Sequence, residues 1–455
     1  MAIRGLPDAE ESFVAGRFDE VMEICGELIV QDPECHQAFY LLGRTCMTLG
    51  NLKEAREMIT QATCIRANAA PYHTELGHLL AAEGQLNAAV DAYRTAVELS
   101  PDFIDPLVNL GAALQLLGCT EEAVAVYEAA VKLAPDAALL HFNLAEMQSE
   151  LGSASCAADG YRRAVELEPE WSELQRKFGL SLLATGEPEA AQEACRKAVS
   201  LKPDDAENHV ALSRSLVAAG DLRGALTICD AYLTSQAFNV AVEACRAFVL
   251  IEMGSRDAGA YLLGLDAFIK RVELSAPVDF GSLSAFNDAL EVEANRRCKP
   301  SLPRLVGNRQ SGGLFREPLA TVALLKERIE ELVCDYIKEL SEADDHPFVL
   351  RQPGTWHLSV YAIELDKNGL IDAHIRSGSW LGGLYIAKVD QPLTVKIGVP
   401  PRGWEFSAEP IARVISLEPG ELLFFPGHVY CSVTPECGGG CLLYGVQILG
   451  SRGHE

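Results

Sequence analysis

The sequence is poor in basic residues and has no long apolar segment. Its 455 residues include 38 Lys and Arg against 64 Asp and Glu, which gives a net charge of -26. An acidic surface of this size repels phosphate backbones and anionic lipid headgroups, so we expect neither nucleic acid nor a membrane as a partner. No window offers the uninterrupted run of about 20 apolar residues that spans a bilayer. The first residues also lack the apolar run of a signal peptide, and these absences together predict a soluble, cytoplasmic protein.

The 14 cysteines do not form the pattern of a disulfide framework. They are scattered through apolar helical positions such as Cys25, Cys195, Cys229 and Cys245. In a chain of this length, such cysteines act as small buried hydrophobic residues in a reducing cytosol. A hydrophobic fraction of 49% indicates a folded protein, and 455 residues are enough for two or three domains.

A period of 34 residues runs through the N-terminal part without an insertion. Small residues recur at one position of the period, at Ala9, Gly43, Gly77, Gly111, Ala145, Gly179, Ser213 and Ala247. Alanines recur at a second position, at Ala55, Ala89, Ala123, Ala157, Ala191 and Ala225. A third position holds Tyr93, Tyr127, Tyr161, Cys195 and Cys229. Prolines close the units at Pro33, Pro101, Pro135, Pro169 and Pro203.

Each repeated position has a physical role. Small residues let the two antiparallel helices of a unit approach closely, the aromatic fills the gap to the next unit, and the proline ends the second helix. The pattern resembles the tetratricopeptide repeat, which implies an all-α solenoid of about eight units over residues 1–264. An ordinary helical bundle is the alternative, but it would not keep a fixed spacing. The first and last units lose the alanine and aromatic positions (Val21, Gly259), as expected of caps.

A solenoid of this kind has a concave face that binds an extended peptide or a partner helix, so we expect a protein or peptide partner. Candidate groove residues on the first helix of each unit are Asn109, Asn143, His73, His141 and His209. Asn109 and Asn143 occupy the same repeat position, where an amide could clamp a peptide backbone. The alternative is that these side chains only cap or solvate their helices.

The pattern changes after the repeats. We expect a connecting helix or linker over residues 265–276, and a break at Ala276–Gly281 that begins a second domain over residues 277–455. Two helices are predicted, over Leu283–Arg297 and Ala320–Leu340. Short strands are predicted over Trp356–Ile363, Leu381–Val389, Leu393–Val399, Ile411–Leu417, Glu421–Phe425 and Leu442–Leu449. The fold class is therefore α+β multidomain, with a helical solenoid followed by a double-stranded β-helix, or jelly roll, with flanking helices.

Several short motifs follow in order through this second domain. They are Phe286–Leu290, Pro300–Leu302, Gln310–Phe315, His346–Phe348, Gly354–Trp356, His374–Tyr385, Glu418–Pro426 and the Phe424–Cys431 segment. Their order and spacing resemble the 2-oxoglutarate/iron(II) oxygenase domain found behind tetratricopeptide repeats in bacterial proteins, a distant relative of prolyl hydroxylases. The resemblance covers about residues 277–450, and it makes Ala373–Trp380 and Phe424–Cys431 the two strands that bear the metal.

The resemblance implies iron(II) and 2-oxoglutarate, held by two histidines and usually a carboxylate, with a basic residue on the co-substrate. His374 keeps the first histidine of the family's His-x-His, but the second position is Arg376, a cation that does not ligate iron. The later histidine position is Cys431 and the arginine position is Cys441. No Lys or Arg occurs from Gly427 to Leu449, so the altered positions favour a domain that binds neither.

Other ligand sets remain open. His428 could be a displaced ligand, although a shift of three residues along a strand reverses its facing. Cys431 with His374 could form a soft zinc or copper site, and His428, Cys431, Cys437 and Cys441 form a loose zinc-like set that a turn at Glu436–Gly440 would separate.

Basic residues offer further alternatives. Lys388 or Lys396 could replace the lost arginine, but each fits a solvated strand position better. Arg376 could pair with Asp372 or bind an anion where the metal would lie. His357 alternates with Trp356 along its strand and is expected to be a surface or packed residue.

Two functions compete. The first is a peptide-binding repeat protein with an oxygenase-like domain that has lost catalysis. The second is an active hydroxylase whose repeats present the substrate, and it rests on the fold-level resemblance together with His374. A thiol or zinc site around Cys431 is a third, weaker possibility.

Overall fold

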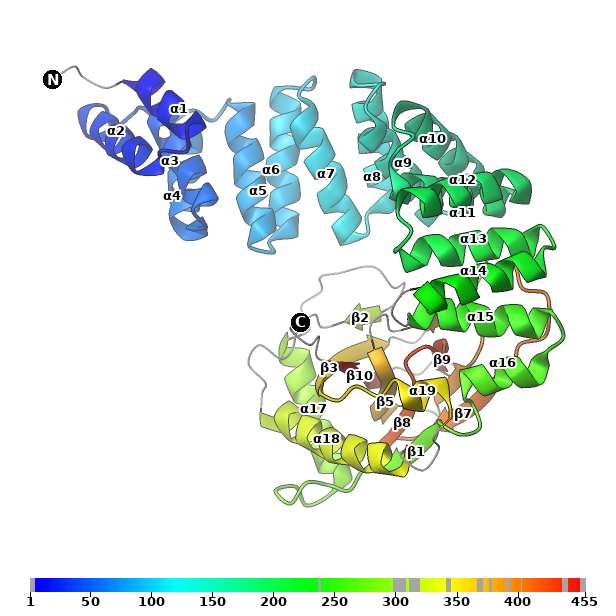
Figure 1. Ribbon diagram of the computed structural model, residues 1–455. Helices are drawn as coiled ribbons and strands as arrows, with labels where there is room; N and C mark the ends of the chain where they lie inside the picture. Colours follow the sequence, from blue (N-terminus) through cyan, green and yellow to red (C-terminus); the bar gives the residue numbers. More distant parts are fainter. Residues whose placement is uncertain are drawn as a thin grey trace. The chain divides into compact units, whose positions relative to one another are not determined.

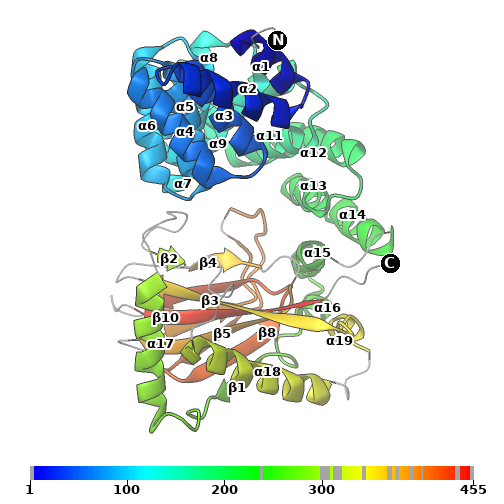
Figure 2. The same ribbon diagram turned by 90° about the vertical axis from the view of Figure 1, so that its left-hand side faces the viewer.

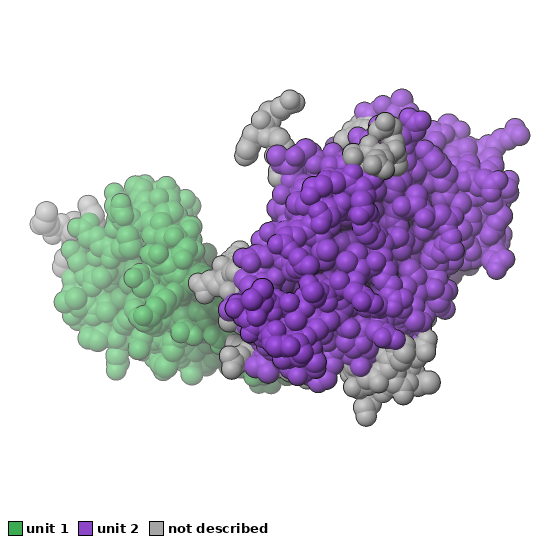
Figure 3. Space-filling model, turned by 90° about the horizontal axis from the view of Figure 1, so that it is seen from below, with its two compact units in different colours: residues 1–168 green, residues 169–455 purple. Residues whose placement is uncertain are grey.

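The computed structural model describes residues 5–235, 239–297, 308–310, 320–340, 345–365, 371–375, 379–389, 393–401, 403–435 and 441–450. The chain divides into two compact units, residues 1–168 and residues 169–455 (Figure 3). This division falls inside the predicted repeat array, while the predicted limits 1–264, 265–276 and 277–455 stay a prediction. Among the described residues, no helix combines the length and the apolar character that a bilayer span needs.

Unit 1 (residues 1–168) is a series of antiparallel helix pairs (Figure 1). Its helices are α1 (Leu6–Val14), α2 (Phe18–Gln31), α3 (His36–Thr48), α4 (Leu52–Ile65), α5 (Ala70–Ala82), α6 (Leu86–Leu99), α7 (Ile104–Leu117), α8 (Thr120–Leu133), α9 (Ala138–Glu150) and α10 (Ala154–Leu167). Each odd-numbered helix is the first of a repeat unit, which confirms the predicted helical solenoid.

The repeated small residues lie where the two helices of a pair touch. A Cβ atom built on Gly77 would lie 2.5 Å from the Tyr93 ring, and one on Gly111 would lie 2.6 Å from the Tyr127 ring. The aromatic thus packs on the glycine of its own pair. Tyr93 also shares an apolar cluster with Leu110 of the next pair, so it fills both gaps.

A further repeated position was not recognised in the sequence. Between the two helices of each pair, one glycine adopts the left-handed conformation, with φ between 69° and 83°. These glycines are Gly16, Gly50, Gly84, Gly118, Gly152, Gly186, Gly220 and Gly254. Gly118 and Gly186 have this conformation at the C-cap position of the first helix. Only glycine adopts this conformation without strain, so it fixes the tight turn in every unit.

Unit 2 (residues 169–455) begins with three helix pairs of the same kind. They are α11 (Ser172–Thr185) with α12 (Pro188–Leu201), α13 (Ala206–Ala218) with α14 (Leu222–Ser235), and α15 (Val240–Glu252) with α16 (Arg256–Leu263). An apolar cluster that includes Cys195, Leu216, Cys229 and Val249 joins these pairs. Their cysteines are buried thiols, as expected from the sequence.

The rest of unit 2 contains two antiparallel sheets. The strands are β1 (Lys270–Glu273), β2 (Asn308–Gln310), β3 (Trp356–Leu365), β4 (Ile371–His374), β5 (Ser379–Val389), β6 (Leu393–Ile397), β7 (Arg413–Leu417), β8 (Glu421–Pro426), β9 (Cys431–Pro435) and β10 (Cys441–Gly450). The six-stranded sheet has the order β1-β8-β5-β10-β3-β2, and the four-stranded sheet has the order β4-β9-β6-β7.

The two faces of the six-stranded sheet are buried in different ways (Figure 2). Helices α17 (Leu283–Arg297) and α18 (Ala320–Leu340) cover one face, and the short helix α19 (Pro347–Leu350) adds Phe348 to the same core. The Tyr385 hydroxyl donates to Asn287 Oδ1 at 2.6 Å, which ties β5 to α17. Side chains of the other face form a second core with the four-stranded sheet.

The predicted helices and most predicted strands agree with the observed ones, but Ala373–Trp380 and Phe424–Cys431 are each divided between two strands, and residues 265–276 also differ. A connecting helix or linker was expected there, whereas Lys270–Glu273 form β1 and pair with β8. This strand is short, charged and at the edge of the sheet, so it lacks the apolar alternation that marks a strand in sequence. The three-residue strand β2 was missed for the same reason.

Candidate functional site

The retained histidine of the predicted metal site lies at the end of β4. His374 is opposite Cys431 of β9 in the antiparallel register, so the structure brings these two predicted residues together. The His374 Nδ1 atom is 3.0 Å from the Asp372 carbonyl oxygen, which only accepts, so Nδ1 carries the proton. Cys431 is 3% exposed and belongs to the apolar core between the sheets.

His428 lies in a buried position between β8 and β9, and its role as a displaced ligand stays a prediction. Its Nε2 atom donates to the Leu262 carbonyl oxygen of α16 at 2.8 Å, and its ring packs near Phe348. Burial lowers the pKa of His428 to about 4, with smaller effects from His346 and Arg351. His428 therefore joins α16 to the sheets as a neutral ring. Among the described residues, no group of three His, Cys, Asp or Glu side chains is placed to hold a metal ion.

Two of the predicted basic residues lie on β5 and β6. Lys388 lies on the face of β5 that α17 covers, where its Nζ atom is 2.7 Å from Glu291 Oε2. A β-bulge at β5 and β10 turns the side chain away from the core between the sheets, and its role on a co-substrate stays a prediction. Lys396 is exposed on β6, as is His357 on β3. Arg376 lies outside the described residues.

The zinc-like cysteine set is not assembled by the described strands. Cys431 begins β9 in the four-stranded sheet, whereas Cys441 begins β10 in the six-stranded sheet and is 5% exposed. Cys437, between them in the chain, lies outside the described residues. His428 is bonded to α16 instead.

A cavity of about 410 Å³ adjoins His374 within unit 2. Helices α11, α13 and α15 form one wall, and residues 373–375 with Tyr430 form the other. The lining residues are Arg176, Leu180, Glu207, Val210, Ala211, Arg214, Ala241, Ala373, His374, Ile375 and Tyr430. The walls are mostly apolar with a few charged groups, which is the usual composition of a ligand site.

Arg214 links the repeat helices to the segment between β6 and β7. Its Nε and Nη2 atoms each donate to Glu405 at 2.9 Å, and Nη2 also donates to the Gly403 carbonyl oxygen at 3.0 Å. The guanidinium lies 5.2 Å from the centre of the Trp404 ring. The side chains of Arg214 and Glu405 are largely buried, so their charges interact in surroundings of low dielectric constant.

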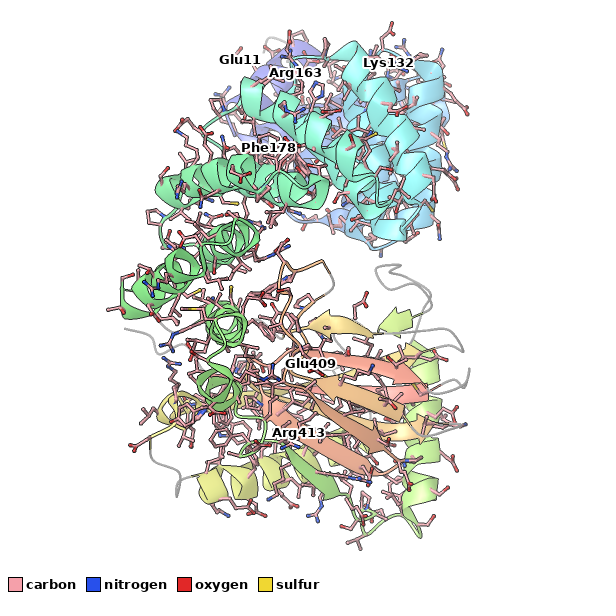
Figure 4. All side chains as sticks on the ribbon, turned by 90° about the vertical axis from the view of Figure 1, so that its right-hand side faces the viewer. Glu11, Lys132, Arg163, Phe178, Glu409 and Arg413 are labelled. Atoms are coloured by element: carbon pink, nitrogen blue, oxygen red, sulfur yellow. The ribbon has the colours of Figure 1, made fainter. Side chains whose placement is uncertain are left out.

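More contacts attach residues 398–412 to the last helix pair. Glu252 accepts hydrogen bonds from the backbone of Ser407 and Ala408 at 2.9 and 2.7 Å. Arg256 donates to the Glu409 carbonyl oxygen at 2.8 Å, in the region where Figure 4 labels Glu409 and Arg413. These bonds explain why the last three repeat units and the sheets form one compact unit.

The predicted groove residues of the repeats are all on first helices of their units. Asn109 donates to the Asp105 carbonyl oxygen of its own helix at 2.7 Å, which fits the alternative that it serves its helix. Asn143 is half-buried on α9. His73 and His141 bond to backbone carbonyl oxygens of the preceding turn, at 2.7 and 2.8 Å. The two histidines therefore bond to turns of their own units, and their role as groove residues stays a prediction.

The repeat pattern does not single out Arg176, Arg214 or Glu405. The repeat position of Arg214 holds an arginine again only at Arg44, with His78, Ala112, Glu146 and Leu180 between them. Glu405 is 191 residues from Arg214 along the chain. A sequence period is made of positions that units share, so a charge found in few units does not stand out in it.

Comparison with known families finds tetratricopeptide repeats. Family models for the tetratricopeptide repeat match residues 36–68, 108–170 and 182–247, and a model described as TPR repeat matches residues 77–118. No curated protein sequence matches the chain.

Solved structures similar to this chain are repeat proteins. A tetratricopeptide repeat protein from Parabacteroides merdae is 15% identical with a TM-score of 0.41, and it covers 50% of this chain and 91% of its own. YrrB, described as a TPR protein with an unusual peptide-binding site, is 18% identical with a TM-score of 0.38. The match covers 40% of this chain and 95% of the YrrB chain. MamA from Desulfovibrio magneticus is 20% identical with a TM-score of 0.35, and the match covers 38% of this chain and 97% of the MamA chain. The family models establish tetratricopeptide repeats in residues 36–68, 77–170 and 182–247 of this chain.

Proposed function

We propose that this protein binds a peptide segment of a partner protein through its repeats, and that its sheet domain is an oxygenase-type jelly roll without catalytic function. The main observation in support of this proposal is the cavity beside His374. Helices α11, α13 and α15 of the repeats form one wall of it, so a peptide held by these helices lies against the sheet domain. A lined cavity of this kind provides both area and specificity for a peptide.

The strand order supports the jelly roll. Strands β3, β5, β8 and β10 belong to the six-stranded sheet, while β4, β6, β7 and β9 belong to the four-stranded sheet. Apart from the β6–β7 pair, consecutive strands from β3 to β10 cross from one sheet to the other, and every pair is antiparallel. This is the arrangement expected of a double-stranded β-helix, with β1 and β2 as added edge strands.

The residues beside His374 do not fit an iron(II) site. Cys431 is the residue opposite His374, and a thiolate suits zinc or copper better than the iron of an oxygenase. The described residues supply no third ligand there. The position of the family's second histidine is Arg376 in this sequence, a cation that does not ligate iron. We therefore assign no reaction step to iron or 2-oxoglutarate in this chain.

One repeat position links the cavity of unit 2 to two predicted groove residues of unit 1. Ala211, which lines the cavity, stands at the repeat position of Asn143 and Asn109. The equivalent side chains of unit 1 therefore face the same side of their helices as the cavity wall of unit 2. The proposal places Asn109 and Asn143 on a peptide-binding surface, where an amide can both donate to and accept from a peptide backbone.

Binding and catalysis are separated by two measurements on the full chain. The first is binding of immobilised peptides that tile candidate partner proteins, compared between the wild type and an Asn109→Ala, Asn143→Ala double variant. We expect weaker binding by the variant, since the amides lose their contacts. Failure of the wild type to retain any peptide would refute the binding function.

The active hydroxylase remains a second candidate, because the retained His374 lines the cavity that the repeat helices also line. That candidate requires succinate release from 2-oxoglutarate with consumption of oxygen in the presence of iron. It also requires that His374→Ala lowers bound iron. We expect neither, and succinate release that depends on His374 would overturn the non-catalytic proposal.

A further inference from the structure

Two buried cysteines of unit 2 are in contact with each other. Cys229 lies on α14 and Cys245 on the next helix, α15, and both belong to the apolar cluster of the last repeat units (Figure 1). Both are free thiols with 0% exposure. The two thiols share a hydrogen bond, and Cys229 Sγ also donates to Ser213 Oγ of α13 at 3.5 Å. The peptide-binding function proposed above uses neither cysteine.

The repeat register explains why two thiols meet at this point. Cys229 occupies the repeat position that holds Tyr127 in an earlier unit, and Cys245 occupies the position of Asn143. The tyrosine position is the one that fills the gap to the following unit. At Cys229 a thiol stands at that position, and the side chain that it reaches across the gap is another thiol, that of Cys245.

The sheet side of unit 2 covers the helix face that carries Cys245. Asn143, at the equivalent position of unit 1, is only half-buried, whereas Cys245 is fully buried. Phe248 lies three residues after Cys245 and therefore on the same face of α15. Its ring centre is 5.6–6.1 Å from those of three aromatic residues, Trp404, Phe406 and Tyr430. An oxidant in solution reaches the thiol pair only when this aromatic cover opens.

The surroundings of the pair favour a thiolate on Cys245. The hydrogen bond from Cys229 lowers the pKa of Cys245, and Ser213 and the charge of Arg214 act in the same direction, against burial and the charge of Glu405. The pKa of Cys229 is raised, because its hydrogen bond to Cys245 and its burial both favour the protonated thiol. The thiolate is the nucleophile in thiol oxidation, so Cys245 reacts first and Cys229 second.

We propose that Cys229 and Cys245 form a redox switch, in which a peroxide oxidises the pair to a disulfide that joins α14 to α15. The Cys245 thiolate attacks one peroxide oxygen and breaks the O–O bond, which gives a sulfenic acid and, after protonation, one molecule of water. The Cys229 sulfur then displaces the hydroxyl group of the sulfenic acid, so that the S–S bond forms and a second water leaves. The pair loses two hydrogen atoms, and hydrogen peroxide is reduced to two waters.

The position of the pair couples its oxidation to the junction between the repeat helices and the sheets. Arg214 holds the covering segment through its two hydrogen bonds to Glu405. Any change that weakens this contact lets the cover open more often, so the thiols are oxidised faster. Because the sulfur atoms are already in contact, small side-chain rotations bring them to the S–S bond length of about 2 Å. The disulfide is therefore compatible with the fold and restricts the unfolded chain.

The test uses the full chain in its native state. A short pulse of iodoacetamide first blocks the accessible thiols, which include Cys64, Cys156 and Cys334. After removal of the reagent, hydrogen peroxide is added, and the protein is digested without reductant for mass spectrometry. We expect a peptide pair linked through Cys229 and Cys245, lighter by two hydrogen atoms and separated by dithiothreitol. The tryptophan transition of the oxidised protein in urea should move to a higher concentration, because the disulfide restricts the unfolded state.

Variants test each part of the proposal. Cys229→Ser and Cys245→Ser should each abolish the linked peptide. Cys195→Ser is the matched control, because Cys195 is also 0% exposed in the same apolar cluster, and this variant should keep the link. Arg214→Met should raise the rate of disulfide formation by roughly tenfold, since a weaker junction opens more often.

Absence of the linked peptide from the oxidised wild type would overturn the proposal, and this result does not depend on the folding of any variant. A linked protein whose urea midpoint is lower than that of the reduced protein would also overturn it, because the disulfide would then form only in a distorted structure. A rate of disulfide formation that Arg214→Met leaves unchanged would refute the coupling to the junction.

Discussion

Exchanging Arg214 for methionine removes the ion pair that joins α13 to the segment between β6 and β7. Glu405 then keeps a carboxylate at 18% exposure without its two donors. The Gly403 carbonyl oxygen also loses a donor, and Trp404 loses a cation beside its ring. The change therefore tests whether the repeat helices hold the sheet domain by this contact.

The magnitude follows from the burial of the pair. Removing one partner of a fully buried ion pair costs about 3–5 kcal/mol, while an exposed pair contributes about 0–1 kcal/mol. At 15% and 18% exposure, with bidentate geometry, Arg214 and Glu405 lie between these limits. We expect Arg214→Met and Glu405→Gln each to lower the free energy of unfolding by about 2 kcal/mol, and the coupling in the double variant to be about 1.5 kcal/mol.

Intrinsic fluorescence measures this effect in unit 2 alone. All 4 tryptophans, Trp171, Trp356, Trp380 and Trp404, lie within residues 169–455. In urea, a loss of about 2 kcal/mol moves the midpoint down by roughly 0.7–1 M if the slope is about 2–3 kcal/mol per molar. Circular dichroism, which is dominated by helices of both units, should show a smaller change in its overall transition.

An exposed pair in the same unit provides the control. Lys197 and Glu170 are 2.6 Å apart but 41% and 70% exposed. The corresponding double-variant cycle should give a coupling below about 0.5 kcal/mol. If the coupling of Arg214 with Glu405 is as small as this control, the pair does not hold the two parts together and the reasoning from burial is wrong.

Three further predictions concern other parts of the chain. Burial holds the pKa of His428 at about 4, below its unfolded value of about 6.5, so the unfolded state binds the proton first and stability falls as the pH drops through this window. His428→Gln should remove up to about 3 kcal/mol of that pH dependence in urea titrations at several pH values. Gly111→Ala should destabilise unit 1 by about 1–3 kcal/mol in thermal unfolding, since its Cβ would meet a ring, whereas Gly26→Ala, with open space around it, should be neutral or stabilising. A fragment of residues 277–455 should fail to give a cooperative unfolding transition, while a fragment of residues 169–455 should give one.

The helical array could be predicted because its information is local and repeated. Small residues at fixed spacing force close helix pairs wherever they occur, and Gly77 against Tyr93 illustrates the contact that the spacing encodes. The bounds of α17 and α18 also agree with the sequence pattern, since long amphipathic helices carry a strong period. Strands β3, β5 and β10 were recognised from apolar alternation and flanking turns.

Features that depend on distant partners could not be predicted. Strand β1 exists because β8 offers its edge, and the Arg271 side chain pairs with Glu421, 150 residues away. The side of the sheet on which the Lys388 side chain lies depends on a β-bulge in its strand, and no residue preference in the sequence predicts that bulge. The same holds for Arg176, whose place in the cavity wall depends on the residues across the cavity rather than on its repeat position.

The last repeat units form both a binding wall and part of the sheet core. Phe248 and Ile251 of α15 pack in the same apolar cluster as Val395 and Phe425 of the sheets, while Ala241 of α15 lines the cavity. A ligand in the cavity therefore binds only the folded form of unit 2. By mass action, a ligand at one hundred times its Kd should stabilise that unit by about 2.7 kcal/mol. The tryptophan transition should rise accordingly with ligand concentration, and Arg176→Met, which removes a charge from the cavity wall, should reduce the rise, so a ligand-dependent shift that this substitution leaves unchanged would place the binding site outside the cavity.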